Sequence, residues 1–126
     1  MLTQYCFCLS HSFSFLQVTI FFSDVVGFTN ICAAVTPIQV VKMLNELYTV
    51  MDYCTSHFPL YKVETIGDAY MLVGGLPVRD THHAQQIADF ALLVSTAVQA
   101  VKSPVDGTPI NIRIGKRASF CLFVCL

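Results

Sequence analysis

Two apolar stretches, each ending at an aspartate close to a glycine turn, constrain the fold of this 126-residue chain most strongly. Asp24 follows the run Val-Thr-Ile-Phe-Phe-Ser at residues 18–23, and Asp68 lies in Thr-Ile-Gly-Asp-Ala-Tyr at residues 65–70. Runs rich in β-branched and aromatic residues predict buried strands. A carboxylate there is costly unless a cation compensates its charge. If the strands are neighbours in one sheet, Asp24 and Asp68 can share divalent cations such as Mg²⁺, which prefer oxygen ligands.

The residues after Asp24 favour phosphate binding. Taken alone, each aspartate is typical of a helix cap or a turn. Val25 to Thr29, with Gly27 at the centre, can turn back with exposed N–H groups and lead into a helix, which forms a phosphate cradle. Two metal ions that bridge one site suit phosphoryl chemistry. Together the two segments predict nucleotide or phosphate binding.

The remaining periodicity predicts one α+β domain. Thr36, Pro37 and Gln39 form a helix start, and Gly67-Asp68 marks a hairpin turn. The predicted strands cover residues 18–23, 60–66, 69–75 and 109–114, and the predicted helices cover about 36–56 and 81–101. The order βαββαβ is that of the ferredoxin-like fold.

The composition points to a partner chain and away from nucleic acid and membranes. Hydrophobic residues make up 55% of the sequence and charged residues 12%, so we expect some apolar surface to face a partner. A net charge of −1 gives no argument for binding nucleic acid or anionic membranes. The apolar stretch at 13–22 is too short to span a bilayer, and no signal peptide is evident. We therefore expect a cytoplasmic chain without a membrane span.

The cysteines, histidines and methionines are predicted to have structural roles. No cysteine has zinc-ligand spacing, and free thiols are expected at Cys6, Cys8, Cys32, Cys54, Cys121 and Cys125. His82 and His83 are adjacent and would point apart on a helix, so both are expected to be solvated. Met43, Met51 and Met71 are expected in the core.

Phe-Phe-Ser-Asp-Val-Val-Gly-Phe-Thr at 21–29, followed by Tyr-Lys-Val-Glu-Thr-Ile-Gly-Asp-Ala-Tyr-Met at 61–71, closely resembles the catalytic domain of class III nucleotidyl cyclases, specifically guanylate cyclases. The similarity runs from about residue 18 to 115 and includes Leu-Asn-Glu-Leu-Tyr at 44–48 and Ile-Arg-Ile-Gly at 112–115. It looks closest to the soluble, nitric-oxide-regulated branch. The resemblance implies conversion of GTP to cyclic GMP and pyrophosphate with two Mg²⁺ or Mn²⁺ ions.

The resemblance also implies roles for individual residues. In this family two aspartates hold the metal pair, which makes Asp24 and Asp68 the expected catalytic residues. The implied metal ligands are Asp24, Val25 and Asp68, and the implied phosphate-facing residues are Val26, Gly27, Phe28 and Thr29.

Glu64 is the expected base-binding residue. By strand alternation Glu64 shares a face with Lys62, so an ion pair between them is one interpretation. The resemblance implies instead that Glu64 accepts hydrogen bonds from guanine N1–H and the 2-amino group, which adenine cannot offer. In this family the metal aspartates and the base-binding residue of one site belong to different chains. A second cyclase chain, in a homodimer or heterodimer, is therefore the implied partner.

The resemblance does not extend to the two ends of the sequence. Residues 1–17 are predicted to be a non-homologous flank, disordered or encoded by intron, and residues 116–126 a non-homologous tail, around a partial catalytic domain at 18–115. Translated intron is the hypothesis for both flanks. The later part of a cyclase domain, with its transition-state asparagine and arginine, is not matched, so this chain alone is expected to be inactive. A non-catalytic dimerisation or regulatory half-site and an adenylate cyclase half remain open alternatives.

Overall fold

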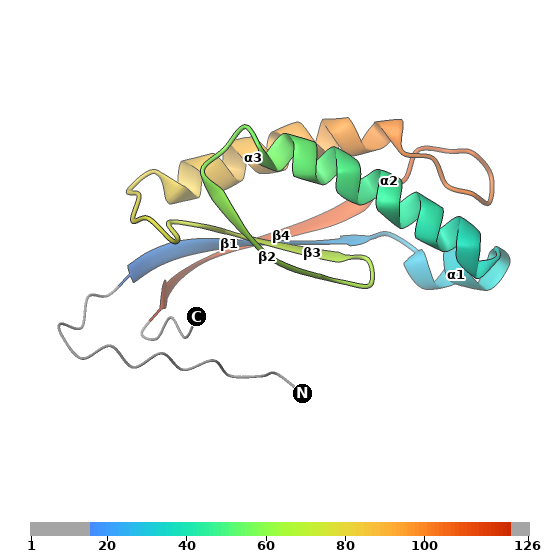
Figure 1. The fold of residues 1–126 in the computed structure, drawn as a ribbon, viewed down its shortest axis with the longest axis horizontal. Helices are drawn as coiled ribbons and strands as arrows, with labels where there is room; N and C mark the ends of the chain where they lie inside the picture. Colours follow the sequence, from blue (N-terminus) through green and yellow to red (C-terminus); the bar gives the residue numbers. More distant parts are fainter. Residues whose placement is uncertain (1–15, 122–126) are drawn as a thin grey trace.

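The computed structural model describes residues 16–121, which form a four-stranded sheet with two long helices on one face (Figure 1). The elements in chain order are β1 (Leu16–Val25), α1 (Phe28–Ala34), α2 (Pro37–Thr55), β2 (Leu60–Ile66), β3 (Ala69–Gly74), α3 (His83–Ala97), the 3₁₀ helix η1 (Val98–Ala100) and β4 (Ile112–Cys121). The strand order is β2-β3-β1-β4, and every neighbouring pair is antiparallel. The predicted α+β fold with a ferredoxin-like core is confirmed, with α1 and η1 as additions.

The helix-covered face of the sheet, on which α2 and α3 lie, carries the hydrophobic core (Figure 1). Phe21 of β1 is fully buried, and its ring meets that of Phe90 of α3 edge-to-face at a centroid distance of 4.9 Å. Tyr70 and Leu72 of β3 and Leu47 of α2 belong to the same core. Because alternate side chains of a strand point to opposite faces, the neighbours of these strand residues point away from the helices.

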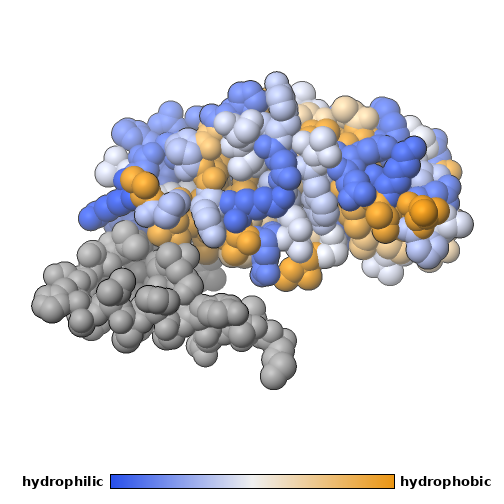
Figure 2. Space-filling model, viewed as in Figure 1, coloured by the Kyte–Doolittle hydropathy of each residue, from blue (hydrophilic) through white to orange (hydrophobic). Residues whose placement is uncertain are grey.

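The second face of the sheet, opposite α2 and α3, retains exposed apolar side chains. Phe22 is 46% exposed and Ile66 is 65% exposed. Phe22 pairs with Met71 on one side and Gly115 on the other, so these residues form one row across the sheet. In Figure 2 hydrophobic residues are visible along the lower edge of the molecule, on the sheet side. Apolar surface is therefore exposed, as the composition predicted.

Two local signals led to the predicted elements. The Thr36 N–H donates to Gln39 Oε1 at 2.9 Å, and this capping box begins α2 as expected. The turn between β2 and β3 consists of Gly67 and Asp68, with Gly67 at a φ of 59°. A positive φ of this kind is readily adopted by glycine, which explains the position of the hairpin.

The prediction that His83 is solvated is wrong, whereas His82 is exposed. His83 begins α3 and is buried against β1, where its Nδ1 lies 2.8 Å from Thr19 Oγ1. The close approach depends on Gly74, since a Cβ there would lie 2.9 Å from the His83 carbonyl oxygen. The sequence-based expectation missed this distant packing partner.

The last strand also differs from its prediction of 109–114. Pro109 forms only an isolated bridge with Lys102, because proline has no N–H to donate to a ladder. The regular ladder begins at Ile112, opposite Val25, and continues to Cys121, opposite Leu16.

Several smaller predictions can be checked in the described residues. Met43 and Met51 are buried as expected, but Met71 is only half-buried and lies on the second face. Cys32 and Cys54 are free thiols. The expectations for residues 1–15 and 122–126, and for the side chains of Cys6, Cys8, Cys121 and Cys125, lie outside the described structure. Within the described residues, no helix is both long and apolar enough to cross a bilayer.

Candidate functional site

A cavity of about 410 Å³ lies where β1 ends, beside the β2–β3 turn and the first residues of β4. Its lining residues come from three distant stretches of sequence and are Asp24, Val25, Gly27, Phe28, Thr29, Asn30, Asp68 and Arg113. We call this cavity the carboxylate pocket. The structure therefore brings both predicted aspartates and most of the predicted phosphate-facing segment together.

Asp24 is held by Arg113, which lies directly opposite it in the β1–β4 ladder. Arg113 Nε donates to Asp24 Oδ1 at 2.7 Å, and Nη2 donates to Oδ2 at 2.8 Å. Hydrogen bonding to Asp24 and its negative charge raise the pKa of Arg113 above its ordinary value. The pair is accessible, because the Asp24 side chain is 42% exposed and the Arg113 side chain 70%. The positively charged guanidinium group of Arg113 therefore contacts both carboxylate oxygens of Asp24.

Asp68 connects the hairpin to the end of β1. Its Oδ2 accepts a hydrogen bond from the Val25 N–H at 3.0 Å. On the helix side, the Tyr48 hydroxyl of α2 donates to the Gly67 carbonyl and so holds the turn that carries Asp68. Burial, and next the negative charge of Asp68, raise the pKa of Tyr48, which keeps this donor protonated. The position of Asp68 thus depends on both β1 and α2.

The segment from Val25 to Thr29 forms a turn that leads into α1. Gly27 has a φ of 71°, and its carbonyl accepts the first hydrogen bonds of the helix, from Asn30 and Ile31. The first turn of a helix leaves N–H groups without intrahelical acceptors, and Phe28 and Thr29 occupy these positions.

Val26, unlike the three residues after it, uses its main-chain N–H in strand pairing. Its N–H donates to the Asn111 carbonyl at 2.9 Å, which extends the β1–β4 ladder. The Val26 side chain is exposed, and the residue does not line the carboxylate pocket. The main-chain donors that remain for a phosphate group are those of Gly27, Phe28 and Thr29.

The carboxylate pocket fits a magnesium or manganese ion only in part. No group of three or more His, Cys, Asp or Glu side chains suited to holding a metal occurs within residues 16–121. Mg²⁺ is often bound by one or two carboxylates, with phosphate oxygens and water completing the shell. Asp24 and Asp68 match that donor set. The contact between the Arg113 guanidinium and Asp24 shows that a positively charged group can reach the Asp24 carboxylate. The residues therefore fit an ion that arrives with a phosphate ligand.

Glu64 does not line the carboxylate pocket. It pairs with Met71, whereas Lys62 pairs with the buried Leu72, because a register shift separates the two residues. The interpretation of a Glu64–Lys62 ion pair on a shared face is therefore wrong. Lys62 instead binds Asp52 of α2 at 2.6 Å.

Arg113 and Tyr48, whose side chains hold the aspartate-bearing segments, had no predicted role. Arg113 lies within the Ile-Arg-Ile-Gly stretch, but its contact with Asp24 depends on strand pairing across 89 residues of sequence. Tyr48 lies within the Leu-Asn-Glu-Leu-Tyr stretch, and its contact depends on where α2 crosses the hairpin. A lone charged residue in an apolar strand was the only available signal for Arg113.

A larger hollow of about 720 Å³ lies between α2 and the end of η1, away from these carboxylates. Its apolar lining includes Ile38, Val41 and Val101. Of the two cavities, the carboxylate pocket combines the paired carboxylates with a guanidinium and a helix start, and only this combination suits a metal-bound phosphate.

Comparisons with known proteins give a family match. The family model for the adenylate and guanylate cyclase catalytic domain matches residues 11–124. The chain is 57% identical over 101 residues to guanylate cyclase soluble subunit beta-2 of Rattus norvegicus, covering 80% of this chain and 15% of that protein. It is 47% identical over 110 residues to retinal guanylyl cyclase 1 of Bos taurus, covering 86% of this chain and 10% of that protein.

A solved structure shows the same likeness in three dimensions. The guanylate cyclase domain of RhGC from Catenaria anguillulae, in complex with GTP, superimposes with a TM-score of 0.77 at 37% identity. The superposition covers 83% of this chain and 57% of that domain. The chain thus spans part of a catalytic domain and a small part of its curated relatives.

Proposed function

Because the chain belongs to the adenylate and guanylate cyclase catalytic domain family, we propose that it supplies the metal- and phosphate-binding half of a guanylate cyclase site. The reaction is the conversion of GTP to cyclic GMP and pyrophosphate. The observation that carries the proposal is the convergence of Asp24, Asp68 and Arg113 on one cavity beside the start of α1. The identity to guanylate cyclases, together with Glu64, favours GTP over ATP.

Asp24 and Asp68 would hold two Mg²⁺ or Mn²⁺ ions through their carboxylate oxygens, with the Val25 carbonyl as a further ligand. When bound, the ions supply Lewis acidity that lowers the pKa of the ribose 3′-hydroxyl and neutralises charge on the triphosphate. The main-chain N–H groups of Gly27, Phe28 and Thr29 orient phosphate oxygens. The hydrogen bond from Val25 to Asp68 fixes the two carboxylates relative to each other.

Arg113 has two uses in the proposed site. In the structure its guanidinium group compensates the charge of Asp24. Its five N–H donors match phosphate as well as carboxylate, so a triphosphate in the pocket offers it a second partner. Because the ion pair is exposed, the exchange requires little free energy. Arg113 thereby binds phosphate in the complex and leaves Asp24 free for the cation.

The second face is the proposed contact with another cyclase chain. It exposes Phe22 and Ile66 and carries Glu64 on the outermost strand. Glu64 lies two strands from Asp24, about 10 Å across the sheet, given the usual strand spacing. This separation suits a site shared between chains, in which Glu64 binds the guanine of a GTP whose phosphates lie on the partner's aspartates. The proposed location is the cytoplasm.

A complementation assay tests the proposal. The 126-residue chain is mixed with a complete soluble guanylate cyclase chain whose own two metal-binding aspartates are changed to alanine, in the presence of Mn²⁺ and GTP. Because the partner has lost its own metal ligands, an active site formed in the mixture has to use Asp24 and Asp68 of this chain. We expect cyclic GMP from the mixture and none from either chain alone.

The matched control compares Asp68→Asn, which should abolish cyclic GMP formation, with Asp89→Asn on the exposed side of α3, which should not. Co-elution of the two chains without any product would identify a non-catalytic half-site. Cyclic AMP formed in preference to cyclic GMP would identify an adenylate cyclase half.

A further inference from the structure

The face on which Glu64 lies is set by an irregularity in β2. In a regular strand, Lys62 and Glu64 would point the same way. The pairing shifts between them, so that Lys62 lies opposite Leu72 and Glu64 opposite Met71. Val63 is the additional residue of a bulge, which reverses the face of everything after it. Without the bulge, Glu64 would point toward the helices.

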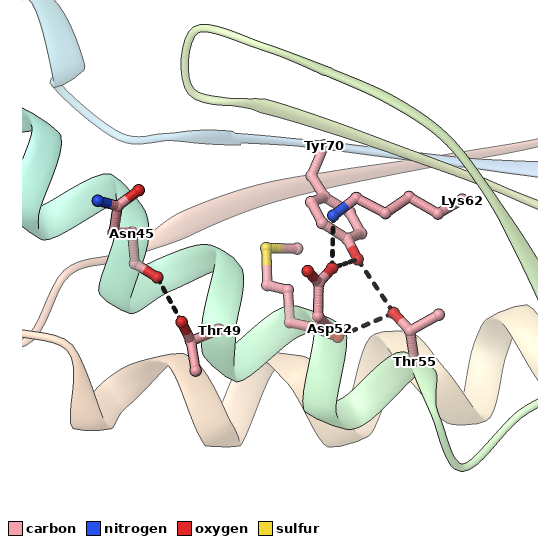
Figure 3. A network of polar contacts seen from close by, with 7 residues as sticks. Asn45, Thr49, Asp52, Thr55, Lys62 and Tyr70 are labelled. Carbon is pink, nitrogen blue, oxygen red and sulfur yellow. Dashed lines mark hydrogen bonds and ion pairs between the residues drawn. The ribbon is translucent and has the colours of Figure 1, made fainter.

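A polar network on the helix-covered face holds the strand immediately before this bulge (Figure 3). Lys62 Nζ lies 2.6 Å from Asp52 Oδ1 and 4.9 Å from the centre of the Tyr70 ring. The Tyr70 hydroxyl donates to the same Asp52 oxygen at 2.5 Å and lies 3.2 Å from Thr55 Oγ1. The network therefore joins α2, β2 and β3.

The charges in this network are stable near neutral pH. Burial alone would raise the pKa of Asp52, but hydrogen bonds from Lys62 and Tyr70 outweigh it and lower that pKa. Burial, and then the bond to Asp52, raise the pKa of Tyr70. Asp52 is thus an anionic anchor with two donors, and Lys62 is directed toward α2.

The network matters because β2, in the part of the chain that the structure describes, is an edge strand paired with β3 alone. A strand of this kind can slip by one residue, and such a slip moves every side chain to the other face. The only charged anchor of β2 on the helix side within the described residues is Lys62, two positions before Glu64. With Lys62 tied to α2, the bulge at Val63 leaves the Glu64 carboxylate on the second face.

We propose that Lys62, Asp52 and Tyr70 are positioning residues for guanine selection, because they fix the bulge that presents Glu64 on the second face. The inference rests on the proposed role of Glu64 in binding the base. It assigns nucleotide selectivity to a cluster on the opposite side of the sheet, which contacts neither the base nor the metal-binding carboxylates.

The test pairs the 126-residue chain with a complete soluble guanylate cyclase chain whose own base-binding glutamate is changed to alanine, so that Glu64 reads the base of a nucleotide held on the partner's aspartates. It measures binding of fluorescent N-methylanthraniloyl GTP and ATP to this pair with Mn²⁺, and compares the ratio of the two affinities. Lys62→Ala and Asp52→Ala should lower the preference for GTP by about tenfold or more, since a misplaced Glu64 carboxylate loses charged hydrogen bonds to guanine, whose loss has an effect of that size. Lys62→Arg, which keeps a cation of similar reach, should retain most of the preference. Lys42→Ala, on the exposed surface of α2, is the matched control and should change nothing.

Two further variants keep the inference falsifiable. Tyr70→Phe preserves the buried ring but removes one donor to Asp52, so a folded variant with reduced GTP preference is expected even where Lys62→Ala proves unstable. Glu64→Ala tests the base-binding role itself. If Glu64→Ala loses the preference while the Lys62, Asp52 and Tyr70 variants keep it, the positioning role is overturned and base binding stands. If Glu64→Ala keeps the preference for GTP, the base-binding role of Glu64 and the positioning role of the network are both overturned.

Discussion

The two faces of the four-stranded sheet use neighbouring residues for different purposes. On β1, Phe21 is fully buried beneath α3, whereas the next residue, Phe22, is 46% exposed on the second face. On β2, Lys62 anchors the strand to α2, whereas Glu64 points the other way with its side chain exposed. The helix-covered face therefore provides stability and register, and the second face presents groups for binding. Substituting Phe21 or Lys62 alters the helix-covered face, and substituting Phe22 or Glu64 alters the second face.

The largest difference is expected between Phe21→Ala and Phe22→Ala. Phe21→Ala removes a buried ring that contacts Phe90, and should lower the free energy of unfolding by about 3–5 kcal/mol. Phe22→Ala should lower it by less than about 1 kcal/mol, because the side chain is half in water already. Urea denaturation followed by circular dichroism measures both. Equal losses would show that the second face is covered in the chain alone.

Arg113→Ala should separate metal binding from phosphate binding. Loss of a charged donor to the triphosphate should weaken binding of Mn²⁺-GTP by about 10–100-fold, as expected for hydrogen bonds to charged groups. Without nucleotide, Mn²⁺ should bind as well as before or up to about fivefold more tightly, since an exposed ion pair with Asp24 no longer competes. Calorimetric titration with each ligand distinguishes the two effects. Weaker Mn²⁺ binding without nucleotide would contradict the exchange proposed for Arg113.

Two glycines offer a matched test of the packed and open faces. Gly74→Ala should destabilise the fold by about 1–3 kcal/mol, since its Cβ would lie 2.9 Å from the His83 carbonyl oxygen and one of the two backbones must shift. Gly115→Ala, on the second face, would place its Cβ with no atom within 4 Å and should change stability by about 0.5 kcal/mol or less. Thermal unfolding compares them. Similar melting temperatures for the two variants would argue against tight packing of α3 on β3.

The smallest expected effect is the pH dependence of the Asp52 network. The pKa of Asp52 is lowered in the folded chain from its ordinary 3.8, so its stabilising contribution is present above that value. The contribution should disappear as the pH falls below 3.8 toward the lowered pKa. At pH 7 the free energy of unfolding of Asp52→Asn should therefore be lower than that of the unaltered chain, by about 1 kcal/mol or less because the ion pair is exposed. This difference between the two free energies should become smaller in acid. A difference in the free energy of unfolding that increases in acid would be inconsistent with an ionised Asp52.

Much of the fold could be predicted from local sequence. The capping box at Thr36 and the Gly67-Asp68 turn each specify an element boundary within a few residues. The grouping of Asp24 and Asp68 followed from two motifs and their resemblance to cyclases, and the structure places both in one pocket.

The remaining features depend on contacts between distant segments. Alternation along β2 assumed a regular strand, and the bulge at Val63 becomes understandable only when Lys62 is seen bound to α2. The burial of His83 depends on Gly74, and the role of Arg113 depends on the register of β4 against β1. In each case the partner lies on a different helix or strand, 10 residues away for Lys62 and Asp52 and 89 for Arg113 and Asp24, so the pattern within one element does not contain it.

The proposed binding role of the carboxylate pocket is tested most directly by a titration of Mn²⁺ into the chain with GTP present, followed by electron paramagnetic resonance of the free ion. The unaltered chain and Asp89→Asn should bind Mn²⁺ with GTP, whereas Asp24→Asn and Asp68→Asn should each weaken it by about 100-fold or more while leaving the circular dichroism spectrum unchanged. Binding that survives in Asp24→Asn and Asp68→Asn would show that the pocket is not the metal–nucleotide site.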